Sequence, residues 1–172
     1  MKRTINWTEV IAIMRQTIRS LTSLDEAHVI EDYSLGSKPT LPFITVHPRG
    51  NIITPVQHQY PMHEPVDTHI SITVHATSES RALDIMDNLQ ANLRDPEIRY
   101  QVKQQGIIIV AVLDPQDQSV IGINNSEQQY GFDLQIRLER NFESDQPTIE
   151  AIDSNNEKKL QEIRRKHYVN YK

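Results

Sequence analysis

Two segments of the sequence alternate strictly between apolar and polar side chains, and this alternation limits the folds open to the chain. In residues 67–76, Ile70, Ile72 and Val74 alternate with two histidines, a serine and a threonine, and residues 129–139 repeat the pattern over a longer stretch. Strict alternation is typical of strands that bury one face and leave the other to water or to a partner. We therefore expect a sheet with one buried face and one open face.

Three segments have the spacing of helices that could cover the buried face. The first begins at Asn6, whose side chain can cap the exposed amides of a first turn, and Thr77, Ser78 and Ser80 are candidate caps for the second. The third has Asp95 as its expected cap and Pro96 at the first helical position, and Gly106 is well placed to end it. The apolar residues of the first helix are Trp7, Val10, Ile11, Met14, Ile18 and Leu21, and those of the second are Ala82, Leu83, Met86, Leu89 and Leu93.

The remaining apolar segments are expected to add strands. Residues 41–47 alternate and are rich in residues that favour strands, and residues 27–30 and 119–123 are candidates for short ones. Residues 107–113 are apolar throughout, which predicts a strand buried on both faces. The order helix, strands, helix pair, strands predicts an α+β fold with a mostly antiparallel sheet and helices packed on one face.

The α+β domain is expected to span residues 1–142, and residues 143–172 to form a polar linker and a basic C-terminal arm. The formal net charge of the chain is −5, but residues 157–172 alone carry +4, so the preceding part carries −9. An acidic body disfavours binding to duplex DNA, because the phosphate backbone attracts clustered lysine and arginine. The same charge would suit a surface past which DNA slides without being bound.

The composition also excludes several classes of protein. The chain has no cysteine, which excludes disulfides, thiolate metal sites and cysteine nucleophiles. Its longest apolar run is too short to cross a bilayer, and no apolar segment typical of a secretory signal follows the basic N-terminal residues. We therefore expect a protein without a membrane partner that folds in the cytoplasm of the cell that makes it.

Seven histidines suggest a metal site, and His58, His63, His69 and His75 lie closest together. His69 and His75 share a strand face but are six residues apart, roughly 20 Å in an extended strand, so they cannot bind one ion. Acidic residues near the expected helix starts are typical of solvated helix ends. The glycine-rich phosphate loops and the GxSxG nucleophile motif are missing from the sequence. We therefore expect no catalytic residue, no metal site and no cofactor.

Two segments are suited to contacts with other proteins. Residues 48–66 contain four prolines and one glycine, and a connection of this length is usually functional or forms a protruding hairpin. In the arm, Leu160 and Ile163 form a thin apolar stripe beside two arginines. The candidate interface residues are Asn51, Ile52, Ile53, Gln57, His58, Tyr60, Leu160, Ile163, Arg164 and Arg165.

Four segments together resemble the tail terminator family of tailed phages, whose members are also called neck terminator or tail completion proteins. They are the opening helix NWTEVIAIMRQTIRSL, the strand LPFITVHP, the strand-to-helix unit HISITVHATSESRALDIMDNLQANL and the closing strand QQYGFDLQIRL. In that family the strand-to-helix unit leads through a short second helix to an apolar strand, and IIIVAVL follows that course here. The resemblance covers roughly residues 5–140 and leaves out the segment from Glu143 onward.

The resemblance implies a structural virion protein, assembled in the host cytoplasm, that forms a homo-oligomeric ring at the head-proximal end of the tail. The ring is typically a hexamer. It would stop growth of the tail tube, contact the tube and any sheath, and dock a head-side connector or stopper protein while DNA passes through its lumen without specific binding. Such a subunit needs protruding loops and arms. Residues 48–66 suit contact with the tube or connector, and residues 143–172 suit contact between subunits.

Three alternatives stay open on the sequence. The nearest is another head–tail connector, such as a stopper or head-completion protein, which would form a similar ring between different neighbours. A metal-binding enzyme using the histidine-rich loop belongs to a different class, and metal analysis of the purified protein would detect it. A soluble regulatory binding domain would stay monomeric and bind no phage structure.

Overall fold

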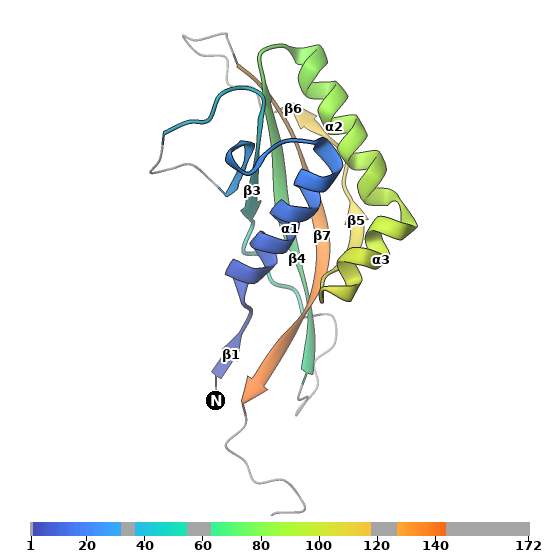
Figure 1. Ribbon diagram of the computed structural model, residues 1–172. Coiled ribbons are helices and arrows are strands. Elements are labelled where there is room, and N and C mark those ends of the chain that lie inside the picture. The colour runs from blue at the N-terminus through green and yellow to red at the C-terminus, as the bar shows by residue number, and fades with distance from the viewer. Residues whose placement is uncertain (1, 32–36, 55–62, 118–126, 144–172) are drawn as a thin grey trace, which may run out of the picture.

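A computed structural model describes residues 2–31, 37–54, 63–117 and 127–143 (Figure 1). These residues form three α-helices, one 3₁₀ turn and a seven-stranded mixed sheet. In chain order the elements are β1 (Lys2–Thr4), α1 (Trp7–Thr22), η1 (Glu26–His28), β2 (Val29–Glu31), β3 (Phe43–Pro48), β4 (His63–Ala76), α2 (Glu79–Arg94), α3 (Pro96–Gln104), β5 (Ile108–Val112), β6 (Gln116–Asp117) and β7 (Gln128–Glu143).

The two longest strands, β4 and β7, form the centre of the sheet. They pair antiparallel along the whole of β4, from His63 opposite Asn141 to Ala76 opposite Gln128. On one side β3 pairs antiparallel with β4, and β2 then pairs parallel with β3. On the other side β1, β5 and β6 pair antiparallel with successive parts of β7. The predicted α+β fold with a mostly antiparallel sheet is confirmed.

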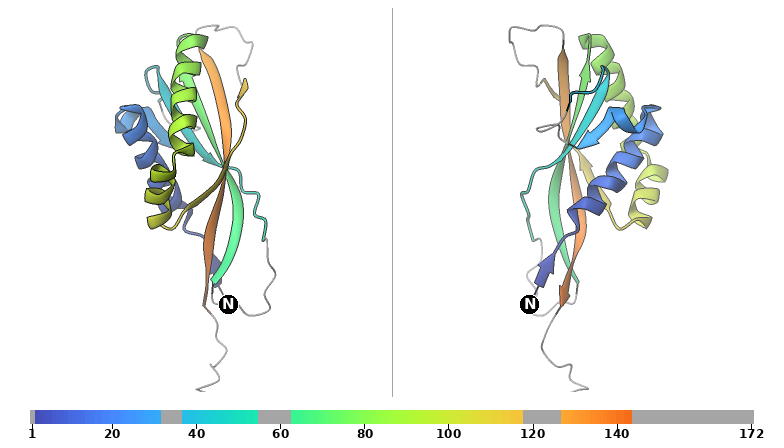
Figure 2. Two further views of the ribbon diagram at one scale, coloured as in Figure 1. Left: turned by 90° about the vertical axis from the view of Figure 1, so that its right-hand side faces the viewer. Right: turned by 60° about the vertical axis from the view of Figure 1, so that its left-hand side comes forward.

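The core lies between the sheet and the three helices, which all cover the same face, as predicted (Figure 2). The even-numbered side chains of β4 and β7 point toward the helices, because successive side chains of a strand point to opposite faces. Burial of each large aliphatic side chain contributes about 1.5–3 kcal/mol. The core includes Val10, Ile11, Met14 and Ile18 of α1, Ala82, Met86, Leu89 and Leu93 of α2, Ile70, Ile72 and Val74 of β4, and Phe132, Leu134 and Ile136 of β7.

The predicted caps begin all three helices. The side chains of Asn6, Ser78 and Asp95 each accept a hydrogen bond from a backbone N–H of the first turn, at 3.3, 3.4 and 2.7 Å respectively. These bonds satisfy amides that have no partner within the helix. Gly106 adopts a φ of +85° just after α3, a conformation that costs glycine little and other residues more. The local sequence therefore accounts for where each helix begins.

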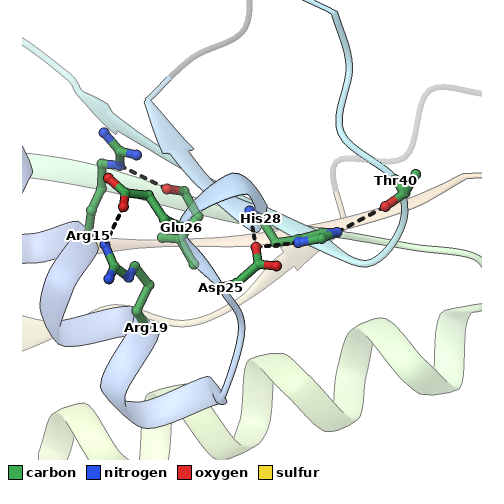
Figure 3. A network of polar contacts seen from close by, with 7 residues as sticks. Arg15, Arg19, Asp25, Glu26, His28 and Thr40 are labelled. Carbon is green, nitrogen blue, oxygen red and sulfur yellow. Dashed lines mark hydrogen bonds and ion pairs between the residues drawn. The ribbon is translucent and has the colours of Figure 1, made fainter.

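A set of polar contacts holds the edge strand β2 and the turn before it against α1 (Figure 3). Arg15 Nε donates a hydrogen bond to the carbonyl oxygen of Val29 at 2.8 Å. His28 lies between two partners, with Nδ1 2.6 Å from Asp25 Oδ1 and Nε2 2.9 Å from Thr40 Oγ1. The hydrogen bond with His28 lowers the pKa of Asp25. The three-residue strand is thus fixed by side chains as well as by its pairing with β3.

Two expectations about strands were wrong or incomplete. The prediction that residues 107–113 are buried on both faces is wrong, since Ile108 is 41% exposed and Leu113 38%. The reason is that the helices cover only one face of the sheet, and Ile108, as the register partner of Arg137, has its side chain on the other face. Strand β1 has no alternating pattern and was not predicted. The short strand expected in residues 119–123 lies outside the described residues.

Thr68 of β4 is a polar residue on the buried face, and it provides a test of the packing. It is fully buried, and its hydroxyl has no hydrogen-bond partner within the described part of the chain. A buried hydroxyl without a partner is destabilising. We expect Thr68→Val, which removes the hydroxyl and keeps the shape, to raise the free energy of unfolding by about 1 kcal/mol in urea denaturation.

The matched control is Thr68→Ala, which also removes a buried methyl group and should lower the free energy of unfolding. A loss of stability in Thr68→Val would contradict the expectation, because it would show that the hydroxyl has a partner in solution.

Candidate docking surface

The face of the sheet opposite the helices, called here the open face, is mainly polar. Figure 2 shows that all the helices lie on the other side of the sheet. The open face is built from the odd-numbered side chains of three adjacent strands, which line up across the sheet because the strands are paired in register. They are Phe43, Thr45 and His47 of β3, Asp67, His69, Ser71, Thr73 and His75 of β4, and Gln129, Asp133, Gln135, Arg137 and Glu139 of β7.

Two ion pairs lie on the open face, one between β4 and β7 and one between β7 and the residue that follows β3. Arg137 donates two hydrogen bonds to the Asp67 carboxylate, with Nε 2.6 Å from Oδ1 and Nη2 3.0 Å from Oδ2. Arg49 Nη2 lies 3.3 Å from Asp133 Oδ1. The hydrogen bond from Arg137 lowers the pKa of Asp67 against the opposing effect of burial, and the same contact raises the pKa of Arg137. The two-bond pair is held in one geometry, as is typical of arginine–carboxylate contacts.

The Asp67–Arg137 pair lies in a row of four side chains that ends in exposed isoleucines. Ile53 and Asp67 form a two-bond backbone bridge with both distances at 2.8 Å, and Ile108 is the register partner of Arg137. Directly opposed residues of antiparallel strands lie on the same face, so all four side chains belong to the open face. Ile53 is 55% exposed and Ile108 41%. Apolar side chains that flank an ordered ion pair are suited to contact with another protein.

A second feature of the open face is the His75 cluster, which consists of His75, Phe43, Thr45, Glu127 and Lys38. His75 is only 3% exposed and stacks on Phe43 with 4.2 Å between ring centroids. Its Nδ1 lies 2.6 Å from Glu127 Oε1, and its Nε2 lies 3.3 Å from Thr45 Oγ1. Lys38 forms an ion pair with Glu127, and its Nζ lies 5.9 Å from the centroid of the Phe43 ring. The cluster ties the segments that precede β3 and β7 to the central strands.

The structure describes three of the ten predicted interface residues. Asn51, Ile52 and Ile53 are exposed, and their segment lies on the side of the sheet away from the helices (Figure 2). Sequence reasoning missed Ile108, because the run of apolar residues around it indicated a buried strand. The other seven predicted residues lie outside the described residues and remain predictions: Gln57, His58, Tyr60, Leu160, Ile163, Arg164 and Arg165.

Metal binding and membrane insertion each require a particular arrangement of side chains. The described residues contain no group of three histidine, aspartate or glutamate side chains placed to hold a metal ion. The side chains of His58 and His63 lie outside this part of the chain. Nor do the described helices include one with the length and apolar character needed to span a bilayer.

The sequence matches a model of a known protein family. The sequence model of the phage neck terminator protein family matches residues 8–162. The chain belongs to the phage neck terminator family. A search of curated proteins found no match.

Membership in this family makes the protein a structural component of the phage neck, as the resemblance predicted, and places it in the virion. The match extends beyond the resemblance, because it continues through residues 143–162 and so includes Leu160.

The His75 cluster predicts a stability effect for this neck terminator. Glu127→Ala would remove the acceptor next to Nδ1 of a histidine that is 3% exposed. A buried polar group that loses its partner costs about 1–3 kcal/mol, and we expect a loss of that size in urea denaturation. Glu127→Gln, which keeps hydrogen-bonding capacity, should lose less. Equal losses in the two variants would contradict a specific role for the contact with His75.

The Asp67–Arg137 pair predicts a pH dependence of stability. The pKa of Asp67 is lower in the folded protein than its ordinary value of 3.8. The stability it contributes is therefore present above that ordinary value and is lost as the pH falls through the folded value. We expect the wild-type protein to exceed Asp67→Asn in free energy of unfolding at neutral pH, and the difference to shrink below about pH 4.

Denaturation curves measured between pH 7 and pH 2 would check this expectation. Asp87→Asn, at an exposed position of α2, is the control for the removal of a surface carboxylate. A difference between wild type and Asp67→Asn that stays constant over the whole range would contradict the assignment.

Proposed function

We propose that this neck terminator assembles into a ring, sixfold in symmetry, that ends the growth of the tail tube and joins the tail to the head-side connector or stopper. The observation that carries the proposal is the family match over residues 8–162. Ring formation, tube termination and head joining are the specific roles that we infer from this membership.

The described surfaces support a ring subunit. A closed ring made from one kind of chain requires two different complementary surfaces on each copy. The sheet presents a rigid open face, because the central strands pair along the whole of β4 and the Asp67–Arg137 ion pair connects them. In this proposal, the exposed residues Ile52 and Ile53 contact the tail tube or the connector, and the C-terminal arm contacts the neighbouring subunit.

The charge distribution supports the passage of DNA through the ring. Residues 1–156 carry a formal charge of −9. A lumen lined by such a body would repel the phosphate backbone, so DNA would pass without being held.

Loss of the protein tests the proposal. We expect particles made without it to show tails of irregular length and heads that remain unjoined, as seen by negative-stain electron microscopy. An antibody raised against the chain should label the junction of head and tail in wild-type virions. Tails of normal length beside heads that have lost their DNA would instead indicate a stopper, and normal virions without label would contradict a structural role.

Complementation with variants tests the surface. Ile53→Asp adds a charge at a position that is 55% exposed, so the fold should tolerate it while docking is impaired. Leu83→Asp is the matched control on α2, at a position that is 36% exposed and belongs to the helix layer. We expect Ile53→Asp to restore fewer joined particles than Leu83→Asp. Equal restoration would remove the role assigned to this segment.

A further inference from the structure

A groove of about 290 Å³ lies between the start of α1 and the end of α3, on the helix side of the sheet. Figure 1 shows the two helices diverging there, with β7 between them. The apolar part of the lining comes from three places that are distant in sequence. Ile5 precedes the cap of α1, and Val10 and Ile13 lie in the first turns of that helix. Ile107 follows α3, and Leu138 belongs to β7.

The charged part of the lining is acidic. Glu9 is exposed and lines the groove, whereas the side chain of Glu139 belongs to the open face, and the described lining includes no lysine or arginine. The carboxyl end of α3 also faces the groove at Gln105, and carbonyl groups at a helix end favour positive charge. Lys103 lies in the last turn of α3 but is not part of the lining. The groove therefore suits a segment that combines a few aliphatic side chains with adjacent positive charge.

We propose that this groove binds the C-terminal segment, residues 157–172, of a second copy of the chain. The proposal rests on the ring proposed above and assigns one of its contacts. The segment carries +4 and contains Leu160 and Ile163, three residues apart and followed directly by two arginines. The aliphatic side chains match the apolar lining, and the arginines match Glu9 and the carboxyl end of α3.

The position of the end of β7 supports a partner in another subunit. Glu143, the last residue of β7, pairs with Lys2 of β1, and β1 leads directly into the groove lining at Ile5. The arm thus leaves the fold at the end where the groove lies. Thirteen residues lie between Glu143 and Glu157, so the two residues are roughly 45 Å apart when the chain is extended. This length is enough to reach an adjacent subunit, and a head-to-tail exchange of arms closes a ring.

A second hollow on the helix side, among the described residues, differs from this groove in its charge. It lies between the end of α1 and α2, and its lining includes Arg81 together with Asp84 and Asn88. A basic segment would meet a cation there, so this hollow is the weaker match and provides a control position on the same side of the sheet.

Disulfide trapping in the full-length protein tests the docking. Because the chain has no cysteine, single substitutions give defined reporters. Gln105→Cys marks the rim of the groove, Gln161→Cys marks the arm without removing Leu160, and Asn88→Cys marks the control hollow. Mixtures of the single variants should form the 105–161 heterodimer at least about tenfold faster than the 88–161 heterodimer, because docking raises the effective concentration.

A second comparison tests whether the arm binds through its apolar side chains or only through its positive charge. Leu160→Asp/Ile163→Asp should abolish the 105–161 heterodimer, while Asn156→Asp/Asn170→Asp, which adds the same charge outside the apolar pair, should keep it. Equal rates at residues 105 and 88 would overturn the proposal. So would a Gln105→Cys/Gln161→Cys variant that links only within one chain. Failure of this trapping in a protein that labels the virion neck would remove the arm contact alone, whereas an unlabelled neck would remove the ring proposal itself.

Discussion

The antiparallel pairing of β4 with β7 is the constraint on which the rest of the structure depends. Side chains alternate between faces with a period of two, so a slip of one residue would turn the Ile72–Phe132 row outward and bring the Thr73–Gly131 row into the core. The apolar helices can bury their stripes only against the face that this register supplies. The same register sets Asp67 opposite Arg137, so the core and the open face are two consequences of one pairing.

Features that depend on a single segment could be predicted from the sequence. The starts of α1, α2 and α3 follow from capping residues, and β4 and β7 follow from alternation, although both strands extend beyond the predicted limits. Features that depend on a partner could not be predicted. Strand β1 exists because β7 offers an edge to residues Lys2–Thr4, and Ile108 is exposed because its register with Arg137 puts it on the face that the helices leave uncovered.

On the candidate surface, too, only the features that depend on a single segment could be predicted. Alternation placed Asp67 and Arg137 on the polar faces of their strands, but only the register makes them an ion pair. His75 also belongs to a polar face, yet it is buried because Phe43 and Glu127 cover it from separate segments. Family membership, in contrast, followed from the order of the segments. That order is a property of the whole chain and does not require any one contact to be known.

The adjacency of the end of β7 to β1 has a mechanical consequence. A load applied to the chain beyond Glu143 would pull along the axis of β7, and the hydrogen bonds of an antiparallel ladder run perpendicular to its strands. Such a load shears many bonds at once instead of opening them one after another. A load along β7 from the chain beyond Glu143 therefore acts in the direction in which the sheet resists extension best.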